Sequence, residues 1–263
     1  MAWLKTRPNV QLRVPNEIRP GETFRATVRL ECRRPVDVDF VDVHLEGEER
    51  WRIGAGQHAT FNARTFLRLG ARLGEARALP AGRTELSVRI PLPPDAPPSY
   101  AGTAAAIEYT LTVHASVPWW PDRREVFQIH VAPSPQPSPE TTPRVYSSDP
   151  AGPGRDEAHA ELSLASAWTR AGDVVSGALA LSNVAQNRYT EITVALQAIE
   201  TLYDGRRVRG TREGLRYQVR LGAEGVEEGT MIPFRFRLPE DATPTLPWVH
   251  RPDGAPGLSS LRW

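Results

Sequence analysis

Residues 90–113 read IPLPPDAPPSYAGTAAAIEYTLTV, and this stretch decides the fold class. Apolar residues alternate at both of its ends, whereas its middle is rich in proline: Pro91, Pro93, Pro94, Pro97 and Pro98. Each proline fixes the backbone φ angle and removes an N–H donor, so such a segment cannot pair in the middle of a sheet. It can still cross stiffly from one strand to the next. The stretch therefore predicts two β-strands joined by a rigid connection.

Period-two alternation of apolar residues extends over most of the first 131 residues. This pattern predicts strands with one buried and one solvated face. The region 36–45 is less regular, as in a strand with a bend or a bulge, and in the region 61–73 Arg64, Arg68 and Arg72 are expected to share the polar face. Such runs, bounded by turn residues, predict an antiparallel β-sandwich. They lie at 10–14, 24–32, 36–45, 61–73, 86–92, 107–113 and 127–131.

The second half of the chain repeats the features of the first half in the same order. The first two correspondences below are both separated by 151 residues. The repeat predicts an all-β chain with two tandem antiparallel β-sandwiches of immunoglobulin-like type. The corresponding segments are RPGETF (19–24) and RAGDVV (170–175), VHLEGEE (43–49) and VALQAIE (194–200), IPLPPDAPPS (90–99) and FRLPEDATPT (236–245), and IEY (107–109) and LRW (261–263).

The repeat also predicts the domain boundaries. The first sandwich covers residues 1–131, and the second covers residues 159–263. Residues 132–158 contain seven prolines and almost no apolar residue, which is typical of a spacer. The second copy stops at the start of its sixth strand, so we expect it to lack its last strand or strands. Either the chain is a piece of a longer protein, or a strand-completing partner fills the open edge.

Charge and cysteine content exclude several classes of function. The 32 basic and 31 acidic residues give a net charge of +1, which provides no large field for a nucleic acid. The single cysteine, Cys32, excludes an internal disulfide and a cysteine zinc cluster. No apolar run is long enough to span a membrane, and the first residues do not resemble a secretory signal. These features favour a cytoplasmic protein.

No short motif indicates catalysis, a metal or a cofactor. The six histidines do not have metal-ligand spacing, and we expect no metal site, no cofactor and no enzymatic activity. A catalytic constellation can still assemble from residues distant in sequence. The candidate residues of this chain are therefore candidates for binding a partner.

Three segments are candidate binding sites, each with a structural alternative. PPSY, with Pro97, Pro98 and Tyr100, has the form of a WW-domain ligand, but it lies in the connection that recurs at 243–246. PWWPD at 118–122 places Trp119 beside Trp120. An exposed tryptophan can anchor a partner. The favoured interpretation is a loop that folds over the end of the sandwich. The third segment, at 203–214, is a phosphate-binding cluster or a solvated hairpin, and its arginines are Arg206, Arg207, Arg209 and Arg212.

The spaced turns and strands resemble the arrestin fold. In the first half, the resemblance rests on RPGETFRATVRLECRRPVDVDFVDVHLEGEE, on LPAGRTELSVRIPLPPDAPPSYAGTAAAIEYTLTV, and on PWWPD before VFQIHV. In the second half it rests on RAGDVVSGALALSNVAQNRYTEITVALQAIET and MIPFRFRLPED. The chain looks most similar to the prokaryotic sporulation-control arrestin-like proteins. The linker is longer than an arrestin hinge, and the buried salt-bridge network of animal arrestins cannot be placed on these residues.

The resemblance implies a cytosolic adaptor or scaffold that binds protein partners reversibly on cupped sheet faces and loops. An alternative is a structural or ligand-binding tandem β-sandwich of immunoglobulin-like or carbohydrate-module type, for which the adjacent tryptophans are the only indication. A third interpretation is peripheral membrane association through the arginine segment.

Overall fold

The computed structural model describes residues 7–54, 56–119, 121–134, 142–149, 158–183, 191–203, 208–222, 229–240, 242–245 and 257–262. Within these residues the regular structure is β-strand, apart from one 3₁₀ turn at Gly56–His58. The chain divides into two compact units, and the boundary between their main segments follows Pro135. The predicted all-β fold with tandem antiparallel sandwiches is confirmed.

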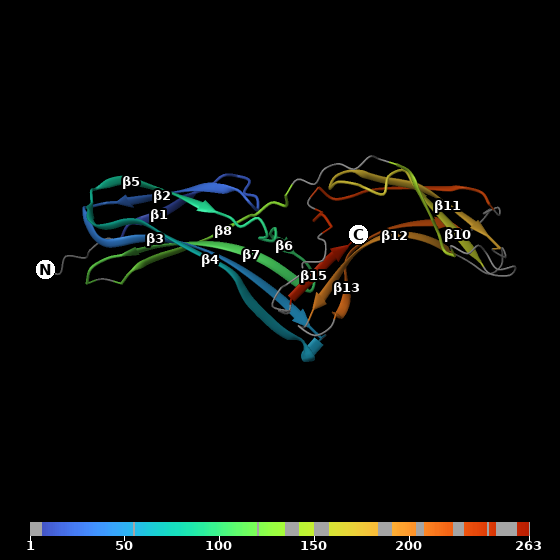
Figure 1. Cartoon of the computed structure of the whole chain (residues 1–263), viewed down its shortest axis with the longest axis horizontal. Helices are drawn as coiled ribbons and strands as arrows, with labels where there is room; N and C mark the ends of the chain where they lie inside the picture. The colour runs from blue at the N-terminus through green and yellow to red at the C-terminus, as the bar shows by residue number, and fades with distance from the viewer. Residues whose placement is uncertain are drawn as a thin grey trace. The chain divides into compact units, whose positions relative to one another are not determined.

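The first unit is built from two antiparallel sheets, which Figure 1 shows as two layers. One sheet has the order β1–β2–β5, from strands Asn9–Arg13, Thr23–Cys32 and Gly82–Pro91. The other has the order β4–β3–β7–β6, and β8 also pairs with β7. Its strands are β3 (Val36–Ile53), β4 (Thr60–Leu79), β6 (Tyr100–Ala101), β7 (Ala105–Ser116) and β8 (Arg123–Ile129).

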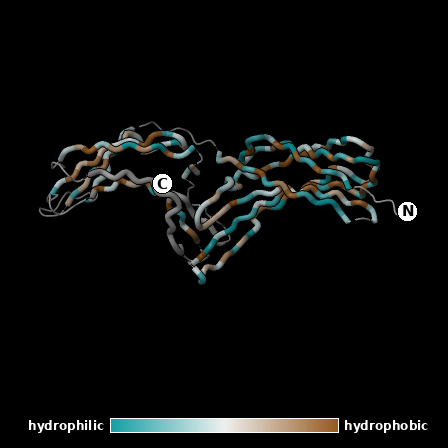
Figure 2. Tube along the Cα trace, turned by 180° about the vertical axis from the view of Figure 1, so that it is seen from behind, coloured by the Kyte–Doolittle hydropathy of each residue, from teal (hydrophilic) through white to brown (hydrophobic). Residues whose placement is uncertain are grey.

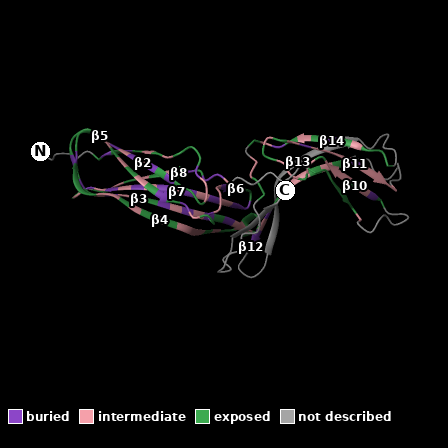
Figure 3. Ribbon diagram, turned by 45° about the horizontal axis from the view of Figure 1, so that its top comes forward, coloured by how far each residue is buried: buried purple, intermediate pink, exposed green. Residues whose placement is uncertain are grey.

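Alternate side chains of the central strands make the core of this unit. Figure 2 shows hydrophobic and hydrophilic residues alternating along the strands, and Figure 3 shows buried positions alternating along β3 and β7. The predicted period of two is therefore correct for these strands. The buried residues include Phe24, Ala26, Val28, Leu30 and Cys32 of β2, and Ile107, Tyr109, Leu111 and Val113 of β7.

A bulge in β4 corrects one prediction from the sequence. Phe66 is an extra residue in the pairing of β4 with β3, so the register shifts there. Arg68 and Arg72 lie opposite residues of the solvated face of β3, but Arg64 lies opposite the buried Glu49. The prediction that the three arginines share a face was wrong, because one extra residue moves the side chains before it to the other face.

The proline-rich connection is fixed to the sandwich by the buried Tyr109. Its hydroxyl donates a hydrogen bond to the carbonyl oxygen of Pro97 at 2.5 Å. Burial raises the pKa of Tyr109, so the hydroxyl remains a donor at neutral pH. The amide of Ser99 donates to the carbonyl of Val131 at 2.8 Å, and the amide of Val131 donates to the Ser99 hydroxyl at 3.0 Å. These bonds replace the strand pairing that the prolines prevent.

Tyr109→Phe is expected to lower the free energy of unfolding by about 1 kcal/mol, because the Pro97 carbonyl loses its donor while the ring still fills its site. Urea unfolding monitored by circular dichroism measures the difference. Tyr146→Phe is the control, because Tyr146 is 47% exposed and its change is expected to leave stability unaltered. Equal effects of the two substitutions would contradict the structural role of the Tyr109 hydroxyl.

The chain after the first sandwich also contains two sheets. One has the order β14–β11–β10–β9 and the other the order β13–β12–β15. Because β9 lies within 132–158, the prediction of a plain spacer was wrong at these four residues, which pair with β10. The strands are β9 (Arg144–Ser147), β10 (His159–Leu164), β11 (Val174–Ser182), β12 (Glu191–Tyr203), β13 (Val208–Gly222), β14 (Ile232–Arg237) and β15 (Gly257–Arg262).

The sheet orders of the two units correspond strand by strand. The order β10–β11–β14 reproduces β1–β2–β5 by sequence position, and β13–β12–β15 reproduces β4–β3–β7. In the described part of the second unit, no strand corresponds to β8, and β15 is therefore the last strand of its sheet.

The repeated proline-rich segments make the same backbone hydrogen bonds. The amide of Gly21 donates to the carbonyl of Pro93 at 3.2 Å, and the amide of Gly172 donates to that of Pro239 at 3.0 Å. Both glycines have positive φ, at 81° and 83°, which only glycine adopts readily. The amide of Leu92 also donates to the carbonyl of Glu22, and the amide of Leu238 donates to that of Asp173, each at 2.9 Å. In both copies, therefore, a glycine turn is hydrogen-bonded to the start of the proline-rich connection.

Candidate functional site

Side chains on the solvated face of the β4–β3–β7–β8 sheet form transverse rows. The register aligns Gly70, His44, Thr112 and Val126 in a middle row. On one side of it lie Arg68, Glu46, Thr110 and Gln128, and on the other lie Arg72, Asp42, His114 and Arg124. The middle row thus places smaller side chains between two polar rows.

This face is hollowed around the middle row. Gly70 provides the space, since a Cβ atom there would lie 3.0 Å from the His44 ring nitrogen Nδ1. Val126 is 62% exposed at the edge of the same face. The lining residues are His44, Leu45, Glu46, Arg68, Leu69, Gly70, Thr112, His114 and Arg124. We call this concave region the sheet hollow.

Ion pairs fix the polar rows beside the sheet hollow. Arg72 contacts both carboxylate oxygens of Asp42, at 2.9 and 3.3 Å, and its guanidinium lies 4.3 Å from the centre of the Phe40 ring. Glu46 accepts hydrogen bonds from Arg68 at 3.0 Å and from Thr65 at 3.1 Å. These two carboxylates are therefore engaged. Among the described residues, no carboxylate lies within ion-pair distance of Arg124, which also lines the hollow.

Trp119 protrudes from the turn between β7 and β8. Its side chain is 97% exposed, and its φ of 60° lies in the left-handed region, which is unusual for a bulky residue. The favoured interpretation of a loop folded over the sandwich end is therefore wrong for Trp119. Strained, exposed residues concentrate at functional sites. Trp120 lies outside the described residues, so its role as a binding residue stays a prediction.

The base of this turn is tied to the sheet hollow. His114 Nε2 lies 2.7 Å from Asp122 Oδ2, and this hydrogen bond lowers the pKa of the Asp122 carboxyl. The His114 ring also packs edge-on against Phe40, with ring centres 5.2 Å apart. The turn that carries Trp119 is thus fixed through a residue that lines the hollow.

The other residues predicted from the sequence do not join this site. Tyr100 is buried and belongs to β6, and the Pro97 carbonyl is occupied by Tyr109. The segment with Pro97, Pro98 and Tyr100 is therefore not presented as a WW-domain ligand, because its tyrosine is part of the core. Arg206 and Arg207 lie outside the described residues. The backbone of Arg209 and Arg212 lies in β13, and their predicted phosphate-binding role stays a prediction.

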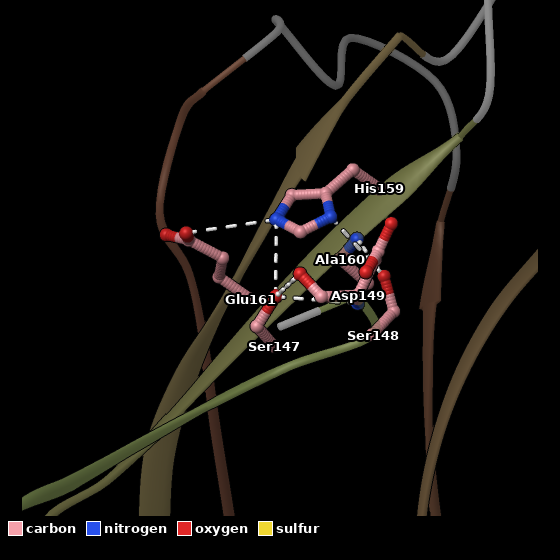
Figure 4. A network of polar contacts seen from close by, with 6 residues as sticks. All are labelled: Ser147, Ser148, Asp149, His159, Ala160 and Glu161. Carbon is pink, nitrogen blue, oxygen red and sulfur yellow. Dashed lines mark hydrogen bonds and ion pairs between the residues drawn. The ribbon is translucent and has the colours of Figure 1, made fainter. Parts of the chain in front are cut away.

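Figure 4 shows a polar cluster that the sequence did not predict, between β9 and β10. The buried His159 has Ser148 Oγ at 3.3 Å from Nδ1 and Ser147 Oγ at 3.4 Å from Nε2. Glu161 lies 3.6 Å from the same Nε2. The His159 ring therefore lies between the Ser148 hydroxyl on its Nδ1 side and the Glu161 carboxylate on its Nε2 side. These contacts tie β9 to β10.

Two findings concern metals and membranes. The described residues contain no group of three or more histidine, cysteine, aspartate or glutamate side chains placed to hold a metal ion. Among the same residues, none belongs to a helix with the length and hydropathy needed to cross a bilayer.

Comparison with known proteins identifies the first unit. Residues 9–134 match the family described as arrestin (or S-antigen), N-terminal domain. Among solved structures, the sporulation control protein Spo0M from Bacillus subtilis is similar at 12% identity and a TM-score of 0.39, over 67% of this chain and 80% of that chain. No curated protein matches the sequence. The residues that form the sandwich of β1 to β8 therefore constitute an arrestin N-terminal domain.

Proposed function

We propose that this protein is a non-enzymatic adaptor or scaffold that binds a partner protein reversibly through its first unit. The observation that carries the proposal is Trp119, a 97% exposed tryptophan on a turn whose base is held by the His114–Asp122 contact. Tryptophan is enriched among residues that dominate binding energies, because it buries a large rigid surface. The match of residues 9–134 to the arrestin N-terminal domain supports the same function, because arrestin-like proteins are generally adaptor and regulatory proteins.

The sheet hollow supplies the polar part of this binding surface. Arg124 and the Thr112 hydroxyl offer hydrogen-bond donors, while the neighbouring carboxylates are engaged by Arg72 and Arg68. A partner that covers the hollow and receives Trp119 would combine an apolar anchor with oriented hydrogen bonds, as in specific transient interfaces. The cytoplasm is the proposed location, and the single, unpaired and buried Cys32 is consistent with a reducing compartment.

Strand addition at β15 is a second binding mode of the same proposed adaptor. In the described residues β15 pairs with β12 and is the last strand of its sheet, whereas its counterpart β7 also pairs with β8. An extended segment of a partner would continue such a sheet through main-chain hydrogen bonds.

Trp119→Ala is expected to reduce partner binding at least about tenfold, because loss of a central aromatic anchor typically costs about 2 kcal/mol. The full chain is immobilised and exposed to extract of its source cells, retained proteins are identified by mass spectrometry, and the main partner is then titrated against purified variants. Phe61→Ala is the matched control, since Phe61 is 77% exposed on the β3–β4 hairpin, away from this turn.

Specific retention of one or a few proteins that is lost in Trp119→Ala and kept in Phe61→Ala supports the proposal. Equal binding by both variants contradicts the role of Trp119. Retention of a glycan in place of a protein would favour the alternative ligand-binding sandwich.

A further inference from the structure

Three arginines on the solvated face of the β1–β2–β5 sheet lie close together. Arg25 of β2 is directly opposite Arg89 of β5 in the strand register. Arg13 of β1 is opposite Thr27, and therefore diagonal to Arg25. All three side chains are exposed. Directly opposed like charges on neighbouring strands are unfavourable, so this arrangement costs stability unless an anion is bound.

The carboxylates of the same face are engaged elsewhere. Glu85 binds Arg29, with contacts of 2.9 Å to Nε and 2.8 Å to Nη2. Glu31 lies 3.8 Å from Arg83. In the described part of the chain, no carboxylate lies within ion-pair distance of Arg13, Arg25 or Arg89. We call Arg13, Arg25, Arg29 and Arg89 the arginine face. Of these four, only Arg29 is paired with a carboxylate of the described residues.

The arginine face is hollowed around Arg13, Arg25 and Arg29, and it has polar side chains between its charges. The hollow extends from the β1 end, at Val14, Pro15 and Asn16, across Arg13 and Thr27 to Glu85. The Thr27 and Ser87 hydroxyls lie 3.1 Å apart across β2 and β5, in the row between the charged pairs. A concave strip with charged and hydroxyl groups fits a narrow segment of a partner chain better than it fits a flat lipid surface.

We propose that the arginine face binds an acidic segment, rich in aspartate or glutamate, of a partner protein. Side chains on one side of an extended segment recur about every 6.8 Å, which is also the spacing of successive same-face residues along β2. Alternate carboxylates of such a segment therefore reach successive rows of the face, where guanidinium groups bind carboxylates in a bidentate manner. This inference rests on the proposed protein-binding function, but it uses the sheet opposite to the one that carries Trp119.

The test measures binding of a fluorescein-labelled polyglutamate peptide of about ten residues to the full chain, by fluorescence anisotropy at low salt, about 50 mM NaCl, where charge interactions are least screened. The double substitution Arg25→Gln with Arg89→Gln is expected to weaken binding at least about tenfold. Arg33→Gln with Arg34→Gln is the matched control. It removes the same charge from exposed residues of the β2–β3 turn and is expected to change the affinity less than twofold.

A second readout separates binding from folding. The Arg25 and Arg89 double variant is expected to melt at the same temperature as the unmodified chain or higher, because a like-charge pair has been removed. A lower melting temperature would mean that the arginines stabilise the fold, and would overturn the proposal. Trp119→Ala is expected to bind the peptide normally, so failure of the Trp119 prediction and failure of this inference are distinguishable.

Four other outcomes would overturn the assignment of an acidic protein segment. The first is that the unmodified chain does not bind the peptide. The second is that both double variants lose affinity equally, which would indicate nonspecific charge attraction. A phosphoserine peptide of equal net charge binds more than tenfold tighter, which would assign the face to phosphate. Phosphatidylserine vesicles bind through Arg25 and Arg89 while the peptide does not, which would assign it to a membrane.

Discussion

Gly177→Ala is expected to lower the free energy of unfolding of the second unit by about 3 kcal/mol, the upper part of the range for overpacked interiors. A Cβ atom on Gly177 would lie 2.1 Å from the carbonyl oxygen of Ser163 and 2.7 Å from the Phe234 ring. The oxygen belongs to the backbone of the adjacent strand β10, so rotation of a side chain cannot relieve the contact. The strands β10 and β11 would have to separate locally.

Gly74→Ala is the control for this prediction. Gly74 also lies in a strand, β4, but a Cβ atom there would meet only the Arg77 side chain, at 3.6 Å or more. We expect its stability to equal or slightly exceed that of the unmodified chain, because alanine reduces the entropy of the unfolded state. Urea unfolding followed by circular dichroism compares the two. If Gly177→Ala is as stable as Gly74→Ala, the close approach of β10 and β11 is not present in solution.

The strands and the repeat could be predicted from the sequence because each depends on local pattern. Alternation requires only that one face of a strand be buried, as in β2 and β7. The glycine turns at Gly21 and Gly172 were visible because a positive φ selects glycine regardless of context. The family followed from the spacing of these turns and strands, and it is confirmed over residues 9–134.

The bulge and the short strand β9 could not be predicted in the same way. An extra residue such as Phe66 leaves both flanking segments alternating, and only the pairing with β3 reveals the change of face. Strand β9 has four exposed residues, so it has no buried face from which a period could be read. It is held by pairing to β10 and by the contacts of His159, which join residues from two strands.

The candidate site was predicted only in part. Adjacent tryptophans drew attention to Trp119, but exposure of a turn residue depends on how the turn folds, and the favoured interpretation was wrong. The sheet hollow and the arginine face were not predicted, because each combines residues from several strands. The strand register determines which residues meet there; it places Arg25 opposite Arg89, for example.

Buried glutamates at corresponding positions provide the second large prediction. Glu49 and Glu200 are the last residues of the matched segments VHLEGEE and VALQAIE, 151 residues apart. They are 1% and 0% exposed, in the central strands β3 and β12, and each makes a polar contact. A fully buried carboxylate is tolerated only when it is paired or hydrogen-bonded. Its occurrence in both units indicates that it belongs to the shared fold.

Glu49→Ala and Glu200→Ala are each expected to lower the free energy of unfolding by about 3 kcal/mol, because removal of one member of a buried polar contact leaves the other without compensation. For Glu49 the register places Arg64 directly opposite, on β4. Glu49→Gln is expected to lose less, since the amide keeps hydrogen-bonding capacity. Glu48→Ala is the control, because Glu48 lies on the solvated face and pairs with Arg50 there.

Hydrogen exchange measured by mass spectrometry can assign each effect to its unit. We expect Glu49→Ala to speed exchange in peptides from β3 and β7, and Glu200→Ala to speed it in peptides from β12. If Glu49→Ala leaves both stability and exchange unchanged while Glu200→Ala does not, the two glutamates do not have equivalent roles. If both have the expected effect, the buried carboxylate is a feature of the sandwich that the two units share, since it is retained where the surrounding residues, such as Gly47 and Ala198, differ.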